Sequence, residues 1–236
     1  MRGDSAASIT AGIVLCGGRS RRMGRPKEWL DFAGVPLLEH VVRQVQPVVE
    51  RVVVAAAPHQ DLPSWPEDPN CPVQIVRDQL PHQGPLAGLL RAWETIPAPT
   101  QRLLVVAVDL PLICPALLQQ LLAQLEANPN VDAVVPYYQG RWQPLLAAYR
   151  HHCLAVLQRL YATGCRRLQE VCAALRIQPI APEHLRPWDP TGICLHNVNT
   201  PEEYATALAL YATARQTAPF PQTIPPASPS ASYTGP

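Results

Sequence analysis

Residues 13–27 read IVLCGGRSRRMGRPK, and this stretch decides how the rest of the chain is interpreted. Residues 9–15 lead into it and are mostly apolar and partly β-branched, which is typical of a strand buried on both faces. Gly17 and Gly18 then end the apolar run. The backbone N–H groups of a glycine loop can approach an anion closely because glycine has no Cβ. We therefore expect a buried strand that runs directly into an anion-binding loop.

Four cations accompany these glycines, namely Arg19, Arg21, Arg22 and Lys27. A guanidinium group binds phosphate oxygens in pairs, whereas a lysine ammonium acts as a movable point charge. The stretch has no Gly-Lys-Ser/Thr ending, and its glycines are not spaced G-x-G-x-x-G. It therefore predicts a phosphate loop of another kind, although glycine and arginine clusters also occur in solvated turns.

The composition favours one domain without a global electrostatic field. The chain has 236 residues, 47% of them hydrophobic, and a formal net charge of +1. A chain of this length can bury one substantial core, and its charge balance predicts no binding to nucleic acid or to a membrane. No apolar stretch approaches the roughly 20 residues that cross a bilayer. The seven cysteines include no C-x-x-C pair, which predicts reduced thiols and a cytoplasmic protein.

The order of apolar segments predicts an α/β fold with a mostly parallel sheet. Strand patterns alternate with helical patterns, which is typical of right-handed parallel crossovers. The last two strands flank Gln139-Gly140 and are expected to form a hairpin that extends the sheet. Strands are predicted at residues 9–15, 51–57, 73–76, 103–108, 131–137 and 142–149, and helices at residues 35–49, 84–95, 115–127, 153–162 and 167–175.

The folded domain is expected to span residues 9–215, after a flexible N-terminus at residues 1–8. Residues 216–236 contain six prolines and no charged side chain. Such a segment has little to bury against a core. We therefore predict a disordered, proline-rich tail.

Polar residues follow two of the predicted strands, at the end where open α/β sheets bind ligands. Asp78 comes after the strand at residues 73–76, and Gly84 opens the next helix. Asp109 comes after the strand at residues 103–108. Mg²⁺ typically takes one or two carboxylates together with phosphate oxygens, so Asp109 is a candidate magnesium ligand. The alternative is that Asp109 caps the helix that begins near Pro115.

Residues 196–204, HNVNTPEEY, contain a helix start and two further amides. Thr200 suits an N-cap and Glu203 stands three residues later, so a capping box accounts for these two residues without any function. It does not account for Asn197 and Asn199, which follow an apolar, strand-like stretch. We expect these two asparagines to contact a ligand.

The loop pattern G-G-x-S-x-R-M-G-x-x-K resembles the signature of nucleotidyltransferases with the sugar-nucleotide transferase fold. It is most similar to the molybdenum cofactor guanylyltransferases, whose loop reads L-A-G-G-x-S-x-R-M-G, with Cys16 here in place of alanine. Further matches follow in the family's order between residues 9 and 208: Asp78, G-P-L-A-G from Gly84, Asp109-x-Pro, Q-P-L from Gln143 and N-x-N-T-P from Asn197. The resemblance implies a Rossmann-like three-layer sandwich of the nucleotide-diphospho-sugar transferase type.

The resemblance also implies a reaction: GMP is transferred from GTP to a molybdopterin-type cofactor, which yields molybdopterin guanine dinucleotide and pyrophosphate. Mg²⁺ is the implied cofactor, and molybdoenzymes or cofactor-delivery proteins are implied partners. The implied roles are catalysis by Lys27, Arg22 and Asp109; nucleotide binding by Leu15, Cys16, Gly17, Gly18, Lys27, Asp78, Gly84 and Asp109; binding of the second substrate by Gln143, Asn197 and Asn199; and metal binding by Asp109.

Three other functions stay open. A cytidylyltransferase acting on the same pterin usually has L-A-A-G in its loop, whereas Gly17 here leaves room for a purine. A sugar-1-phosphate nucleotidylyltransferase is usually longer. A non-catalytic nucleotide-binding subunit would be expected to lack the lysine or the metal carboxylate, and this chain has Lys27 and Asp109. This chain differs from the family at one position that contacts the nucleotide. Family members often have an asparagine at the end of the second strand, where this chain has Ala55-Ala56-Ala57.

Overall fold

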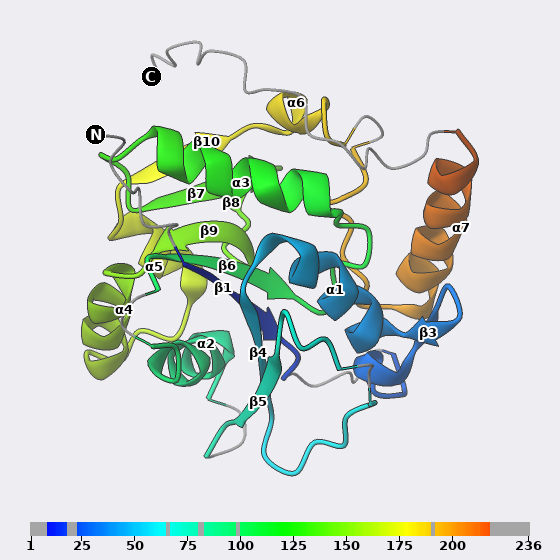
Figure 1. Cartoon of the computed structure of the whole chain (residues 1–236), viewed down its shortest axis with the longest axis horizontal. Coiled ribbons are helices and arrows are strands. Elements are labelled where there is room, and N and C mark those ends of the chain that lie inside the picture. The colour runs from blue at the N-terminus through cyan, green and yellow to red at the C-terminus, as the bar shows by residue number, and fades with distance from the viewer. Residues whose placement is uncertain are drawn as a thin grey trace.

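A mostly parallel, eight-stranded sheet runs through the middle of the protein (Figure 1). This computed structural model describes residues 9–17, 23–64, 67–79, 83–97, 100–189 and 192–217. The strand order is β10-β7-β9-β6-β1-β4-β5, and β8 pairs with β7 beside this path. The strands of this sheet are β1 (Thr10–Leu15), β4 (Arg51–Ala56), β5 (Val73–Arg77), β6 (Arg102–Ala107), β7 (Ala133–Tyr138), β8 (Arg141–Trp142), β9 (Leu146–Arg150) and β10 (Ile177–Ile180), while β2 (Asp31–Phe32) and β3 (Val35–Pro36) form a separate ladder.

The first strand lies inside the sheet and pairs in parallel with β4 on one side and β6 on the other. All six residues of β1 are buried, as expected for a strand covered on both faces. β4 also pairs in parallel with β5, whereas β9 runs antiparallel to β6 and β7. The predicted α/β fold with a mostly parallel sheet is therefore confirmed.

Helices cover both faces of the sheet (Figure 1). They are α1 (Leu37–Val45), α2 (Pro85–Glu94), α3 (Pro115–Ala127), α4 (Cys153–Ala162), α5 (Leu168–Ala173), α6 (Pro182–Leu185) and α7 (Pro201–Thr217), with the 3₁₀ turns η1 (Lys27–Trp29) and η2 (Gln46–Val48). Val14 of β1 packs in one apolar cluster with α1 and α3, and its neighbour Ile13 packs in a second cluster with α2, α4 and α5. Successive side chains of a strand alternate between faces, so the two clusters are the two halves of a three-layer sandwich, as predicted.

Some predicted boundaries are wrong. The helix predicted at residues 35–49 begins at Leu37, because Val35 and Pro36 pair with Asp31 and Phe32. It ends at Val45 and continues as η2, which holds Pro47. The strand predicted at residues 142–149 is divided into β8 and β9 by residues 143–145. The sequence pattern also predicts no strand at β10, a four-residue edge strand that contains Pro179.

The last helix, the chain ends and the cysteines bear on predictions made for the whole chain. α7 extends to Thr217, beyond the predicted end of the domain at residue 215. The segments at residues 1–8 and 218–236 lie outside the described residues, so their predicted disorder stays a prediction. Within the described ranges, no helix is both long and apolar enough to cross a membrane. All seven cysteines are free thiols, as predicted.

Asp132 joins the edge strand β10 to the rest of the sheet. Its carboxylate accepts hydrogen bonds from the backbone N–H of Arg176 at 2.9 Å and from the Arg176 guanidinium at 2.6 and 3.1 Å. The ring Nε2 of His152 lies 2.9 Å away. The bonds from Arg176 hold the pKa of Asp132 well below its usual range, against the opposing effect of burial. The charged carboxylate is therefore stabilised by the fold.

We expect Asp132→Asn to lower the free energy of unfolding by about 2 kcal/mol near neutral pH, because hydrogen bonds to a charged group are lost. The folded-state pKa is lowered, so this stabilisation is present above the unfolded pKa of about 4 and is lost as the pH falls further. Urea denaturation of both proteins between about pH 7 and pH 3 should show the difference shrinking. A difference that stays constant over this range would contradict the role of the charge.

Candidate functional site

Four parallel strands end at one edge of the sheet and place the predicted site residues in a row. In spatial order, Asp109 follows β6, Gly17 follows β1, Ala57 follows β4 and Asp78 follows β5. Neighbouring strands lie about 4.8 Å apart, so Asp109 and Asp78 stand roughly 14 Å apart along this edge. Ligands of open α/β sheets bind at such an edge. Asp78 and Asp109 therefore mark two ends of the site and do not share one ligand atom.

The glycine loop begins as a continuation of the β1–β4 pairing. The backbone N–H groups of Cys16 and Gly17 both donate to the Ala55 carbonyl, at 2.8 and 3.2 Å. A Cβ at Gly17 would stand 3.4 Å from the Ala57 nitrogen, so the two chain segments lie in close contact. Leu15 and Cys16 are both buried. The predicted residues Gly18 and Arg22 lie outside the described residues, and their roles stay predictions.

Lys27, Asp109 and Asn199 come together from three distant parts of the chain. The Lys27 ammonium donates to the Asn199 side-chain oxygen at 2.8 Å and lies 3.6 Å from the Asp109 carboxylate. The Lys27 side chain is 15% exposed and that of Asp109 is 27% exposed. The backbone also links two of these segments, because Val198 N–H donates to the Asp109 carbonyl at 2.8 Å. Three residues to which the sequence analysis gave separate roles are therefore neighbours in the fold.

The environment of Asp109 fits a cation better than a helix cap. Burial raises the pKa of Asp109, and the neighbouring Lys27 ammonium lowers it by a smaller amount. The N-cap of α3 is Cys114, so the alternative that Asp109 caps this helix is wrong. In the part of the chain that the structure describes, no three His, Cys, Asp or Glu residues gather to form a metal cage. A single carboxylate suits Mg²⁺, which completes its coordination with phosphate oxygens and water.

The segment before α7 is fixed by the predicted capping box. Thr200 Oγ1 accepts from the Glu203 N–H at 3.2 Å, and the Glu203 carboxylate accepts from the Asn199 and Thr200 N–H groups at 2.6 and 3.2 Å. Residues 193–199 form turns and irregular backbone, so the strand-like stretch expected before the asparagines is not a strand. The capping box therefore has a second effect, because it also positions the backbone of Asn199.

A cavity of about 300 Å³ opens beside Asp109. It lies between the end of β6, the β8–β9 connection, α5 and the segment before α7. All three residues predicted to bind the second substrate line it. The lining includes Asp109, Gln143, Asn197 and Asn199 on its polar side, and Trp142 and Leu168 among its apolar residues.

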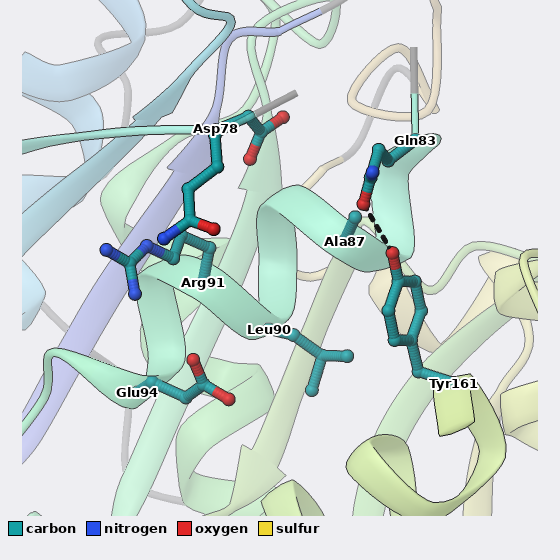
Figure 2. Close-up of a pocket in the computed structure, with 8 residues that line it drawn as sticks. Asp78, Gln83, Ala87, Leu90, Arg91, Glu94 and Tyr161 are labelled. Atoms are coloured by element: carbon teal, nitrogen blue, oxygen red, sulfur yellow. Dashed lines mark hydrogen bonds between the residues drawn. The ribbon is translucent and has the colours of Figure 1, made fainter. Parts of the chain in front are cut away.

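A smaller cavity of about 200 Å³ lies at the other end of the row, between α2 and α4 (Figure 2). Asp78 is at one side, where its N–H donates to the Ala56 carbonyl at 2.9 Å. A Cβ on Gly88 would lie 3.6 Å from both Asp78 carboxylate oxygens, so the Asp78 side chain stands against α2 at this position. Burial raises the pKa of Asp78, while Arg91 on α2 lowers it. Gly84, with φ of 87°, precedes the helix in a conformation that favours glycine.

Gln60 is a further residue of the site that the sequence motifs do not reveal. Its Oε1 accepts from the Ala57 N–H at 2.8 Å, while its Nε2 lies 3.2 Å from the Cys16 carbonyl and 2.6 Å from the Glu28 carboxylate. Glu28 is only 5% exposed. One amide thus connects the ends of two strands to η1, next to Lys27. Nothing in the loop sequence around Gln60 indicates these contacts, since each partner is distant in sequence or a backbone group.

We expect Gln60→Leu to lower the free energy of unfolding by about 2 to 3 kcal/mol, because the buried Glu28 carboxylate and the Ala57 N–H both lose a partner. Gln46→Leu is the matched control, since the Gln46 amide donates to the Cys71 carbonyl at 3.2 Å. It should cost about 1 kcal/mol, the usual net value of one hydrogen bond. Urea denaturation would measure both variants, and equal costs would contradict the connecting role of Gln60.

Gly17, Lys27 and Asp109 lie at the carboxyl edge of a mostly parallel sheet, which is where open α/β folds bind nucleotides. Residues 12–179 match the family model of the MobA-like NTP transferase domain. The chain therefore belongs to this family.

Relatives and solved structures agree with this assignment. The chain is 39% identical over 212 residues to a probable molybdenum cofactor guanylyltransferase of Chloroflexus aggregans, a match that covers 87% of this chain and 96% of that protein. It is 33% identical over 200 residues to a protein of the same name from Bacillus cereus, covering 84% of this chain and 94% of the relative. The fold is similar to that of molybdopterin-guanine dinucleotide biosynthesis protein A from Archaeoglobus fulgidus, with a TM-score of 0.68, 23% identity, and coverage of 86% and 99%.

Proposed function

We propose that this protein transfers GMP from GTP to a molybdopterin-type cofactor and releases pyrophosphate. The observation that carries the proposal is the group of Lys27, Asp109 and Asn199, because Lys27 contacts both of the other residues and these two line the 300 Å³ cavity. The printed names of the relatives, molybdenum cofactor guanylyltransferase, support the identity of the two substrates. The product would then pass to molybdoenzymes or cofactor-delivery proteins.

The row of strand ends suggests how the two substrates meet. GTP would lie along the carboxyl edge, with its base toward Asp78 and its phosphates at Gly17, Lys27 and Asp109. The acceptor would occupy the cavity lined by Gln143 and Asn197, with its terminal phosphate toward Asp109. An oxygen of that phosphate forms the new bond to the α-phosphorus of GTP. The bond from the α-phosphorus to the bridging oxygen breaks, and pyrophosphate leaves with that electron pair.

Catalysis of this step depends on alignment and charge. The attacking phosphate is already ionised near neutral pH, so no side chain has to remove a proton. The protein has to hold two anions in line and offset the charge that develops around the α-phosphorus. Lys27 supplies one positive charge, and its bond to Asn199 fixes where that charge lies. Asp109 would hold Mg²⁺, which neutralises phosphate charge when bound.

Asp109→Asn should lower turnover by about two to three orders of magnitude, as expected when a strong electrostatic stabiliser is lost. The substitution keeps the shape of the side chain and removes its charge. Folding should survive, because burial already disfavours the charged carboxylate at this position. Dinucleotide formation at saturating GTP and Mg²⁺ measures the effect, and thermal denaturation measures stability. Normal turnover with a lowered melting temperature would refute the metal role.

Asp132→Asn is the matched control for this experiment. It makes the same chemical change at a buried aspartate whose partners, Arg176 and His152, lie outside the cavity lining. We expect it to lower the melting temperature and to leave turnover within about twofold at a temperature where both proteins are folded. The pair of variants thus separates the loss of charge at the site from the loss of charge elsewhere.

GTP should be used at least about 100-fold better than CTP, measured as kcat/KM. The Asp78 carboxylate can accept hydrogen bonds from the N1–H and amino group of guanine, and cytosine lacks this pair of donors. Gly17 has no side chain, and a Cβ there would already stand 3.4 Å from the Ala57 nitrogen, so a larger residue would crowd the end of β4. Initial rates with each nucleotide, Mg²⁺ and molybdopterin would measure the ratio. Equal use of CTP would favour a cytidylyltransferase instead.

A further inference from the structure

Trp142 lies in the tight β7–β8 hairpin, at the side of the 300 Å³ cavity. Gln139 and Gly140 have φ values of 50° and 73°, which is the conformation of a two-residue type I′ turn. The turn pairs Tyr138 with Arg141 and Tyr137 with Trp142. Trp142 is half-buried and lines the cavity. Its position is therefore set by the shortest connection that two antiparallel strands can have.

Two neighbours hold the Trp142 segment in place. The Tyr137 ring contacts the indole edge to face, with centroids 4.8 Å apart and an interplanar angle of 64°. Gln169 on α5 donates from Nε2 to the Trp142 carbonyl at 2.7 Å. The next residue is also fixed, because Gln143 N–H donates to the Pro136 carbonyl at 2.9 Å. An aromatic side chain held in this way loses little conformational freedom when a ligand binds.

The cavity has two chemically different ends. At one end, the cavity is lined by Asp109 and Asn199, which contact Lys27. Trp142 and Leu168 supply an aromatic and an aliphatic surface, with the Gln143 amide next to Trp142. A site of this kind fits a ligand with an anionic end and a flat ring whose edge can form hydrogen bonds. Its volume of about 300 Å³ lies at the lower end of the range for small-molecule sites and is large enough for one ring system.

We propose that Trp142 is the stacking surface for the pterin ring of the acceptor, and that Gln169 is a positioning residue that holds Trp142 through its backbone. This inference rests on the proposed function, which supplies a pterin with a terminal phosphate. Stacking at Trp142 sets the ring at a fixed distance from Asp109 and so directs the phosphate toward the α-phosphorus of GTP. Trp142 thereby selects acceptors that have a planar ring.

The test compares Trp142→Leu, which keeps an apolar side chain without a π face, with Trp142→Phe, which keeps an aromatic ring. Trp142→Leu should raise KM for molybdopterin about 10- to 100-fold, the loss expected when one ring loses its aromatic partner. Trp142→Phe should raise it less than about threefold. KM for GTP and the melting temperature should change little in both variants. A Trp142→Leu enzyme with unchanged KM for molybdopterin overturns the inference and leaves the proposed function intact.

Gln169→Ala should raise KM for molybdopterin by a smaller factor, about two- to fivefold, because it loosens the ring without removing it. Gln158→Ala is its matched control, since this exposed glutamine on α4 donates to Glu94 and does not line the cavity. It should leave both KM values unchanged. Trp29→Leu is the corresponding control for tryptophan loss, because Trp29 is 46% exposed and lies outside the cavity lining.

A binding measurement keeps the inference testable if the wild-type protein forms no dinucleotide. Isothermal titration calorimetry with a simple hydroxymethylpterin reports on the ring alone. Binding by the wild-type protein that Trp142→Leu abolishes and Trp142→Phe retains supports the stacking role, even if the proposed reaction fails. Absence of binding by the wild-type protein, or equal binding by Trp142→Leu, overturns it.

Discussion

The parallel pairing of β1 with β4 and β6 is the constraint on which the rest of the structure depends. Parallel neighbours need long crossovers, which place helices on both faces and bury the strand completely. Gly12 in β1 makes this packing close, because a Cβ there would stand 2.6 Å from a methyl carbon of Val45 on α1. The same pairing forces every strand of this group to end at one edge. The residues that follow those strands are therefore neighbours in space although they are far apart in the chain.

The sequence predicts best those features that depend on a local pattern. The buried strands have continuous apolar runs, and α3 has a proline at its first turn, so both were identifiable from composition and spacing. Asp109 stands out because it ends an apolar run, and Lys27 stands out because it closes a loop rich in glycine and arginine. β10 is short and contains Pro179, which an edge strand tolerates but which weakens a strand pattern. The division of β8 from β9 likewise depends on contacts made across the sheet.

The residues that the sequence does not reveal act through contacts with distant or backbone groups. Gln60 is one polar residue in a long loop, and its amide reaches both Cys16 and Ala57 only after β1 and β4 have paired. This contact lies beside the alanines at the end of β4, so the junction between the two strands has a side-chain amide that comes from Gln60. The small alanine side chains leave room for it, since Ala55 and Ala56 are buried against the sheet and Gly17 lies beside Ala57.

The carboxyl edge of the sheet also determines the electrostatics of the site, because it brings Asp109 and Lys27 together. Burial raises the pKa of Asp109 more than Lys27 lowers it, so the nearby ammonium does not fully offset the cost of a charged carboxylate there. Lys27 is shared with Asn199, which draws part of its hydrogen-bonding capacity away from Asp109. A bound cation would stabilise the charged carboxylate at this position. Phosphate oxygens would in turn stabilise a cation that lies beside a lysine. In the proposed reaction, Mg²⁺ bound at Asp109 would offset the cost of the charged carboxylate, and the nucleotide phosphates would complete the coordination of the metal.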